Sequence, residues 1–303
     1  MKIAIMGIGG IGGIVGGALA RKFDDIHFIA RGKTLEAIRK NGLSITSTEL
    51  GEFITKPASI TDNPDEIGVV DVLVLATKSY DLKSACELCA PIIDENTIII
   101  PLLNGVSIAE ETQTYCGGKG QVAHGCIYCF AHIVSPGVIE QSGALFYIDV
   151  GFKDQRKSPT LEKFVAMLNE VGIKTNYRND ILTSVWEKYM MMGGNSCAFA
   201  YYENNAGEIR ADQEKVDYIR GIYQELANIA KAVDVTLADD IVDKYMNVFN
   251  NVPDGTITSL YRDMKVPGKK NEFDAIIGEA YRIGTQAGVP IPLIEKVYKK
   301  YRP

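Results

Sequence analysis

Glycines near the start of the chain have the spacing of a dinucleotide-binding turn. Gly7, Gly9 and Gly12 follow the pattern G-x-G-x-x-G, inside a strand-helix-strand unit that spans residues 2–30. Such glycines let the backbone approach a pyrophosphate, which then lies at the positive N-terminus of the helix. The alternative is a turn that packs helix on strand without a ligand, but the complete unit favours a cofactor. The residues expected to line the cofactor are Gly7, Ile8, Gly9, Gly10, Ile11 and Gly12.

A basic residue at the end of the second strand indicates which dinucleotide is bound. NAD sites usually place Asp or Glu about 20 residues after the glycines, where the carboxylate binds the ribose 2′-hydroxyl. In this chain the position holds Arg31, and Lys33 follows it closely. A guanidinium suits a 2′-phosphate, so the sequence predicts NADP(H). The alternative is that both cations are solvated loop residues.

Polar side chains also follow two further apolar strands of the same region. Residues 71–76 and 97–100 are continuous apolar runs of the kind buried on both faces of a parallel sheet. Lys78 follows the first run and Asn104 follows the second. Ligands of open α/β sheets bind beyond the carboxyl ends of the strands, so both side chains are candidates for the site. Either residue is also placed to cap the next helix.

Composition and charge limit the classes of function. The chain has 303 residues, 46% of them hydrophobic and 23% charged, with a net charge of −6. This balance argues against nucleic acid or an anionic membrane as a partner. No apolar run reaches the length of about 18 residues that a membrane span needs, and the chain opens on a strand instead of a signal peptide. We therefore expect a soluble, cytoplasmic protein.

Two cysteine pairs have the C-x-x-C spacing that some metal sites share. Cys86 and Cys89 fall in a predicted helix, whereas Cys126 and Cys129 fall in a predicted strand. Strand residues three apart point to opposite faces and cannot chelate one ion together. We therefore expect no metal site and interpret the cysteines as reduced, mostly buried thiols.

The element pattern predicts two domains, a Rossmann-type domain over residues 1–177 and a helical substrate domain over residues 178–303. Residues 121–150 have a strand-like pattern, which we interpret as an antiparallel extension of the sheet. The expected strands are 2–6, 26–30, 43–46, 52–55, 71–76, 97–100 and 173–175. The expected helices are 11–21, 35–40, one ending near Cys89, 159–170 with Ser158 as N-cap, 182–202, 213–233, 239–252, 272–287 and a short final helix. The long amphipathic helices suit either a homodimer or the core of a monomer.

Five features occur in order along the chain: the glycine motif, Thr77-Lys78, Leu103-Asn104-Gly105, Val185-Trp186-Glu187-Lys188, and Ser259-x-x-x-Asp263 with Glu272-x-Asp274-Ala-Ile-x-Gly278. Together these features resemble the ketopantoate reductase (2-dehydropantoate 2-reductase) family. The resemblance implies a Rossmann NADP-binding domain, followed by an all-α domain like that of 6-phosphogluconate dehydrogenase. It also implies reduction of the 2-oxo acid ketopantoate to pantoate with NADPH, on the route to pantothenate and coenzyme A.

The family pattern assigns a role to each matching residue. It makes Lys188 the catalytic lysine and Glu272 its acidic partner, and Glu272 is also expected near the cofactor. Asn104 would lie between nicotinamide and substrate, and Ser259 would contact the substrate. Arg31 and Lys78 would bind the cofactor.

This assignment is chemically reasonable. Hydride transfer to a ketone builds negative charge on oxygen, which a lysine in a partly dry cleft can stabilise and protonate. The alternatives are a surface lysine at 188 and a first-turn acid at 272 that only favours the helix dipole.

The sequence departs from the family pattern where the substrate would be held. Met192, Ser196 and Ala206 stand at positions where the family usually has asparagine. At about 100° per residue, Asn195 lies about 20° from Lys188 around the helix, whereas Ser196 lies about 80° away, so geometry makes Asn195 a candidate substrate contact. Ser196 is a candidate because it stands at one of the family's asparagine positions. Gly193-Gly194 would loosen the helix there, or else pack against another helix. Two alternatives therefore stay open: another 2-oxo acid as substrate, or a non-catalytic NADPH-binding sensor.

Overall fold

Contacts within the chain divide it into two units. The computed structural model describes residues 1–302, and the first unit comprises Met1–Leu103 and Ser107–Ile181. The second comprises Leu182–Pro303 together with a short segment, Asn104–Val106, whose sequence neighbours belong to the first unit. The contact boundary thus lies four residues after the predicted boundary at residue 177.

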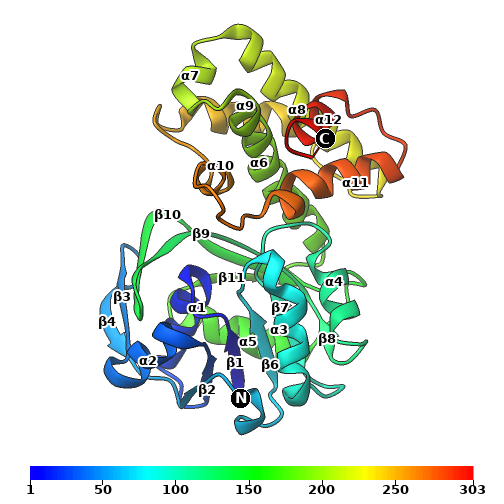
Figure 1. Cartoon of the computed structure of the whole chain (residues 1–303). Helices are drawn as coiled ribbons and strands as arrows, with labels where there is room; N and C mark the ends of the chain where they lie inside the picture. The colour runs from blue at the N-terminus through cyan, green and yellow to red at the C-terminus, as the bar shows by residue number, and fades with distance from the viewer. Residues whose placement is uncertain (303) are drawn as a thin grey trace. The chain divides into compact units, whose positions relative to one another are not determined.

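A parallel sheet forms the centre of the first unit, as predicted. Its strands follow the order β5-β2-β1-β6-β7-β8, and every neighbouring pair is parallel (Figure 1). The central strands are buried because helices cover both faces of the sheet. The strands are β1 (Ile3–Met6), β2 (Ile26–Ile29), β5 (Ser59–Thr61), β6 (Val72–Leu75), β7 (Ile98–Pro101) and β8 (Gln121–Val122). Strand β5 was not predicted.

The helices of the first unit begin and end close to the predicted residues. Ser158 caps α5, since its hydroxyl accepts the N–H of Leu161 at 3.3 Å and Pro159 occupies the first helical position. The helices are α1 (Gly10–Ala20), α2 (Gly32–Asn41), α3 (Leu82–Cys89), α4 (Ile108–Tyr115) and α5 (Pro159–Glu170), with short 3-10 turns η1 (Pro64–Glu66), η2 (Ser79–Asp81) and η3 (Ala90–Ile92). Helix α4 was not predicted.

The predicted antiparallel extension of the sheet is wrong. Strands β9 (His124–Ser135) and β10 (Val138–Gly151) do pair antiparallel, but they belong to a second sheet. Strand β10 also pairs parallel with β3 (Leu43–Ser47) and β11 (Lys174–Tyr177), and β4 (Gly51–Thr55) completes the order β11-β10-β3-β4. This sheet forms because β3, the weak strand after α2, supplies a partner for the hairpin.

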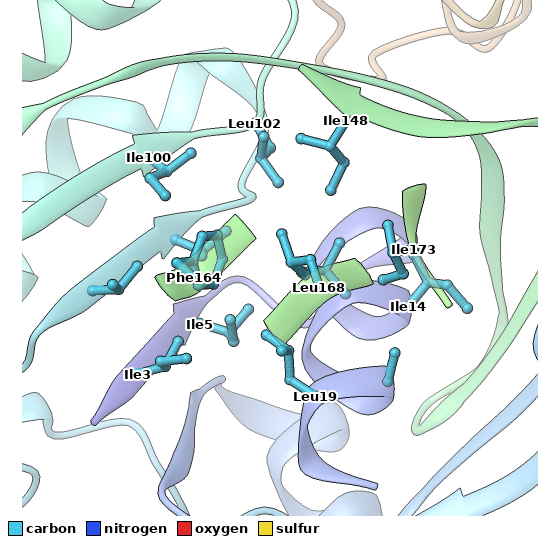
Figure 2. Close-up of a cluster of buried hydrophobic side chains, with 14 of the residues drawn as sticks. Ile3, Ile5, Ile14, Leu19, Ile100, Leu102, Ile148, Phe164, Leu168 and Ile173 are labelled. Atoms are coloured by element: carbon cyan, nitrogen blue, oxygen red, sulfur yellow. The ribbon is translucent and has the colours of Figure 1, made fainter. Parts of the chain in front are cut away.

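Helix α1 lies between the two sheets and carries the core of the first unit. On one side Gly16 contacts Phe28 and Ile5 of the parallel sheet, and on the other Gly17 contacts Ile45 of β3. A side chain at either glycine would overlap these neighbours, so the glycines let both sheets approach the helix. Figure 2 shows the resulting cluster, which joins α1, α5 and strands of both sheets. Its labelled members are Ile3, Ile5, Ile14, Leu19, Ile100, Leu102, Ile148, Phe164, Leu168 and Ile173.

The two C-x-x-C pairs lie on the types of element that were predicted for them. Cys86 and Cys89 are on α3, whereas Cys126 and Cys129 are on β9. All six cysteines are free thiols, and all except the half-buried Cys129 are buried.

The second unit is helical, as predicted. Three long helices, α6, α8 and α9, match the expected ranges. Helices α7 and α10 were not predicted. The predicted helix 272–287 opens with a π-helical turn, η4. None of the helices that the structure describes is both long and apolar enough to span a membrane. The elements are α6 (Ile181–Tyr202), α7 (Ala206–Arg210), α8 (Gln213–Ala232), α9 (Ile241–Asn251), α10 (Ser259–Met264), η4 (Asp274–Gly278), α11 (Glu279–Gln286) and α12 (Pro292–Tyr301).

Candidate functional site

The glycine turn after β1 is shaped by close backbone contacts. Gly7 has φ +94°, a conformation that side-chain-bearing residues rarely adopt. A Cβ on Gly12 would overlap the Gly7 carbonyl oxygen, so this glycine keeps the turn tight. Gly9 precedes the first residue of α1, and a Cβ there would meet nothing within 4 Å. The turn therefore leaves open space at the N-terminus of an 11-residue helix.

The surroundings of the turn fit the phosphates of a dinucleotide. Thr77, just after β6, contacts Gly7, and its buried hydroxyl has no hydrogen-bond partner among the described residues. On another side the Ala131 carbonyl of β9 packs directly on Gly10. Orphaned helix amides, the positive end of the dipole and a spare hydroxyl are groups that bind phosphate oxygens. Gly7, Ile8, Gly9, Gly10, Ile11 and Gly12 thus form one cradle, together with Thr77.

Basic side chains lie on both sides of the cradle. Strands β2 and β6 flank β1, so Arg31 after β2 and Lys78 after β6 follow the strands next to the turn. The Arg31 side chain is 86% exposed, and its Nη2 lies 3.7 Å from Oδ2 of Asp81. Lys78 is exposed and makes no capping hydrogen bond to η2. Arg31 is therefore available to a ligand anion, with Asp81 as a competing carboxylate.

In the second unit the structure brings Lys188 and Asn104 together. The Lys188 ammonium donates to Oδ1 of Asn104 at 3.1 Å, across 84 residues of sequence. Both side chains are half-buried, so Lys188 is not a surface lysine. The neighbouring Trp186 is 5% exposed and packs edge-on against Tyr189, which fixes this part of α6. An ammonium held in this way can donate to a developing alkoxide.

Glu272 lies just before the helical turns of η4. Its side chain is only 6% exposed, and its backbone carbonyl accepts the N–H of Ile276 at 3.0 Å. A solvated first-turn acid that only interacts with the helix dipole would be exposed. The Glu272 side chain is therefore not a solvated first-turn acid.

The predicted substrate contacts near Lys188 have different environments. Oδ1 of Asn195 accepts the Tyr223 hydroxyl of α8 at 2.8 Å, so this amide already has a partner on a neighbouring helix. Helix α6 continues unbroken past Gly194, where a Cβ would overlap the Tyr223 ring. Gly194 thus serves helix packing, the alternative considered above. Ser196 is fully buried, and its hydroxyl has no partner among the described residues.

The remaining predicted positions lie on other elements of the second unit. Ser259 is the exposed first residue of α10, behind the N-cap Thr258. Met192 is half-buried on α6, and Ala206 is fully buried at the start of α7. Neither Met192 nor Ala206 can replace the hydrogen bonds of an asparagine amide.

One residue near Asn104 was missed by the sequence analysis. Glu279, the first residue of α11, is 5% exposed, and its Oε2 accepts the backbone N–H of Val106 at 2.9 Å. Arg282 lies one turn later, with Nη2 3.8 Å from Oε1 of Glu279. The only available signal was an acid in the predicted helix seven residues after Glu272.

Comparisons with known proteins cover almost the whole chain. The family model described as ketopantoate reductase PanE/ApbA matches residues 3–155, and the model of its C-terminal part matches residues 180–303. An uncharacterized oxidoreductase of Bacillus subtilis, YkpB, is 26% identical over 98% of this chain and 97% of its own length.

Two similar proteins carry a more specific name. The 2-dehydropantoate 2-reductase of Mesorhizobium japonicum is 26% identical over 98% of this chain and 95% of its own. The crystal structure of 2-dehydropantoate 2-reductase from Porphyromonas gingivalis is 28% identical, with a TM-score of 0.83 over 99% of this chain and 98% of that one. The chain therefore belongs to the ketopantoate reductase family, pyridine-nucleotide-dependent oxidoreductases that act on a CH–OH group.

Proposed function

We propose that this protein reduces ketopantoate to pantoate with NADPH, in the synthesis of pantothenate and coenzyme A, and that Lys188 is the general acid. The observation that carries the proposal is the bond between Lys188 and Asn104, two residues that the family pattern assigns to the reacting centre. The names of the relatives support the substrate. The predictions of a cytoplasmic location and of a homodimer through the helical unit accompany this proposal.

The first unit would hold the cofactor through its backbone. The α1 N-terminus and the Thr77 hydroxyl would bind the pyrophosphate, and Arg31 would bind the 2′-phosphate of the adenosine ribose. Lys78 is a further proposed cofactor contact. When bound, NADPH supplies a hydride for the carbonyl carbon. These residues supply affinity and orientation, and the preference for NADPH over NADH depends on Arg31 in particular.

The second unit would supply the proton. As the hydride reaches C2 of the 2-oxo acid, the carbonyl electron pair moves to oxygen, and the Lys188 ammonium stabilises that charge and gives it a proton. Asn104 keeps the ammonium in place by accepting one of its three N–H bonds. Glu272, Ser259, Asn195 and Ser196 are the proposed contacts to substrate, and Glu272 also faces the cofactor in this proposal.

Another 2-oxo acid is the second candidate substrate. Met192 and Ala206 offer no hydrogen bonds, and the Asn195 amide oxygen already accepts from Tyr223. These substitutions remove polar contacts that would suit the hydroxyl and carboxylate of ketopantoate, so a less polar 2-oxo acid is an alternative.

The test is a substrate panel measured by loss of NADPH absorbance. We expect purified protein to turn over ketopantoate faster than other branched, aromatic and straight-chain 2-oxo acids. K188A is expected to lower kcat by about 10³-fold, because both charge stabilisation and proton donation are lost. The Kd of NADPH should stay within about threefold, because K188A removes none of the proposed cofactor contacts.

Three outcomes would change the proposal. Preference for another 2-oxo acid would replace the substrate and leave the mechanism standing. NADPH binding without turnover of any 2-oxo acid would favour the non-catalytic sensor. A K188A variant with kcat within tenfold of wild type would remove Lys188 from the role of general acid.

A further inference from the structure

A buried hydrogen bond holds the far end of the segment that carries Asn104. Val106 lies two residues after Asn104 and is buried, and its N–H donates to the Glu279 carboxylate at 2.9 Å. Hydrogen bonds from backbone amides to an ionised carboxylate are about twice as strong as neutral ones. Arg282, 3.8 Å from the same carboxylate, offsets part of the cost of burying the charge.

A glycine lies at the centre of the segment 104–106. Gly105 separates Asn104 from Val106 and has φ +128°, a region that glycine enters far more readily than other residues. A chain with glycine at its centre has more conformations to lose, so its geometry depends on anchors at both ends. Lys188 contacts the first residue of the segment and Glu279 contacts the last.

A second bond ties α6, which carries Lys188, to η4, the turn that directly precedes Glu279. The hydroxyl of Tyr189, which follows Lys188 in α6, donates to the Ile276 carbonyl of η4 at 2.5 Å. A tyrosine hydroxyl is protonated at neutral pH, and burial raises the pKa of Tyr189 still further, so the hydroxyl is a donor throughout the neutral range. The π turn ends immediately before Glu279. A π-helical turn contains one residue more than an α-helical turn, so it rotates the following residues about the helix axis. The π turn η4 therefore determines the direction in which Glu279 points.

We propose that Glu279 is a positioning residue of the proposed reductase. It holds Val106, and thereby Asn104, in the place where the amide oxygen receives the Lys188 ammonium. Glu279 acts through Asn104 and Lys188 and not on the substrate. This inference rests on the proposed function for its kinetic consequence, whereas its structural consequence is measurable without turnover.

Glu225 provides a matched control on the same unit. It is 7% exposed, and its two carboxylate oxygens accept the N–H groups of Leu293 and Ile294 at 2.8 and 2.9 Å, at the start of α12. Glu225 and Glu279 are thus both buried carboxylates that accept backbone N–H groups. Only Glu279 is connected to Asn104.

The experiment compares E279A, E279Q and E225A with wild type. We expect E279A to lower kcat by about 30-fold while KM for the 2-oxo acid and Kd for NADPH change less than about threefold, because the reacting geometry is lost. E279Q keeps an acceptor oxygen and should recover kcat to within about fivefold. E225A should lower Tm by at least as much as E279A and leave kcat within about twofold of wild type.

Two readouts by NMR test the positioning itself. Hydrogen exchange of the Val106 amide should be at least about 10-fold faster in E279A than in wild type, E279Q or E225A. The side-chain amide resonance of Asn104 should move in E279A toward its position in K188A. An Asn104 resonance unchanged in E279A would overturn the inference, whether or not wild type reduces a 2-oxo acid. Unchanged kcat in E279A, with active wild type, would overturn it and leave the proposed function intact.

Discussion

The cofactor cradle and the Lys188–Asn104 pair are built in different ways. Apart from Thr77, the cradle consists of consecutive residues on one turn, Gly7 to Gly12, which lead into the N-terminus of α1 and its backbone amides. The pair consists of two side chains 84 residues apart, which meet because the segment 104–106 packs with the second unit. The cradle therefore depends on positions that carry no side chain, whereas the Lys188–Asn104 pair depends on a few contacts that hold its two side chains in place.

This difference predicts which property a substitution should impair at each site. A Cβ at Gly12 would overlap backbone, which cannot move without opening the turn. Loss of an anchor such as Glu279 leaves both members of the pair present but displaced. The first change should act on cofactor affinity and stability together, and the second on kcat.

The largest effect is expected for G12A, with G9A as its matched partner. The G12A side chain would overlap the Gly7 carbonyl, so we expect a loss of about 2–3 kcal/mol of stability and at least 100-fold weaker NADPH binding. The G9A side chain meets no protein atom within 4 Å, so Tm should change little while NADPH binding weakens through contact with the cofactor. Thermal melts and fluorescence titration measure both. Equal losses of Tm in the two variants would contradict this account.

A smaller and more selective effect is expected for R31A. Loss of the guanidinium should raise the Kd of NADPH by about 10- to 100-fold and leave the Kd of NADH within about threefold, because only NADPH carries a 2′-phosphate. D81N removes the carboxylate 3.7 Å from Arg31 and should lower the Kd of NADPH by about twofold. Titrations at one ionic strength make the comparison. Parallel losses of both cofactors in R31A would place Arg31 outside the 2′-phosphate site.

The smallest effect concerns two buried hydroxyls, one in each unit. Those of Thr77 and Ser196 have no hydrogen-bond partner among the described residues, which disfavours the folded state without ligand. S196A should therefore raise stability by about 1 kcal/mol and lower kcat/KM for the 2-oxo acid by about fivefold. T77V should raise stability similarly and weaken NADPH binding instead. An S196A variant with unchanged kcat/KM would remove Ser196 from the substrate contacts.

The parallel sheet could be predicted from sequence because its signals are local. The central strands β1, β6 and β7 are continuous apolar runs, and caps such as Ser158 mark where helices begin. The short strand β5 lacks such a run and was missed. The second sheet could not be predicted in this way. Strand β10 pairs with β3, about 95 residues earlier, and nothing in residues 43–47 indicates that partner. Without it, the hairpin pattern is equally compatible with the parallel sheet.

The same difference between local and long-range signals applies to the candidate site. The cradle could be predicted from a motif of six residues, whereas Lys188, Glu272 and Ser259 were identified only through resemblance to a family. Glu279 was missed because a buried carboxylate on a helix has the same sequence pattern as an exposed one. Its orientation depends on the π turn η4, which helical periodicity does not predict.

The assignment of residues 104–106 to the second unit has a consequence for recombination. A chimera that joins the first unit of this chain to residues 182–303 of a relative exchanges Lys188 and Glu279 but keeps the native segment 104–106. In such a chimera the helices of the relative would have to pack against the segment 104–106 of this chain. We expect such chimeras to be most active when residues 104–106 are exchanged together with the helices. The exchanged region is then discontinuous in the gene.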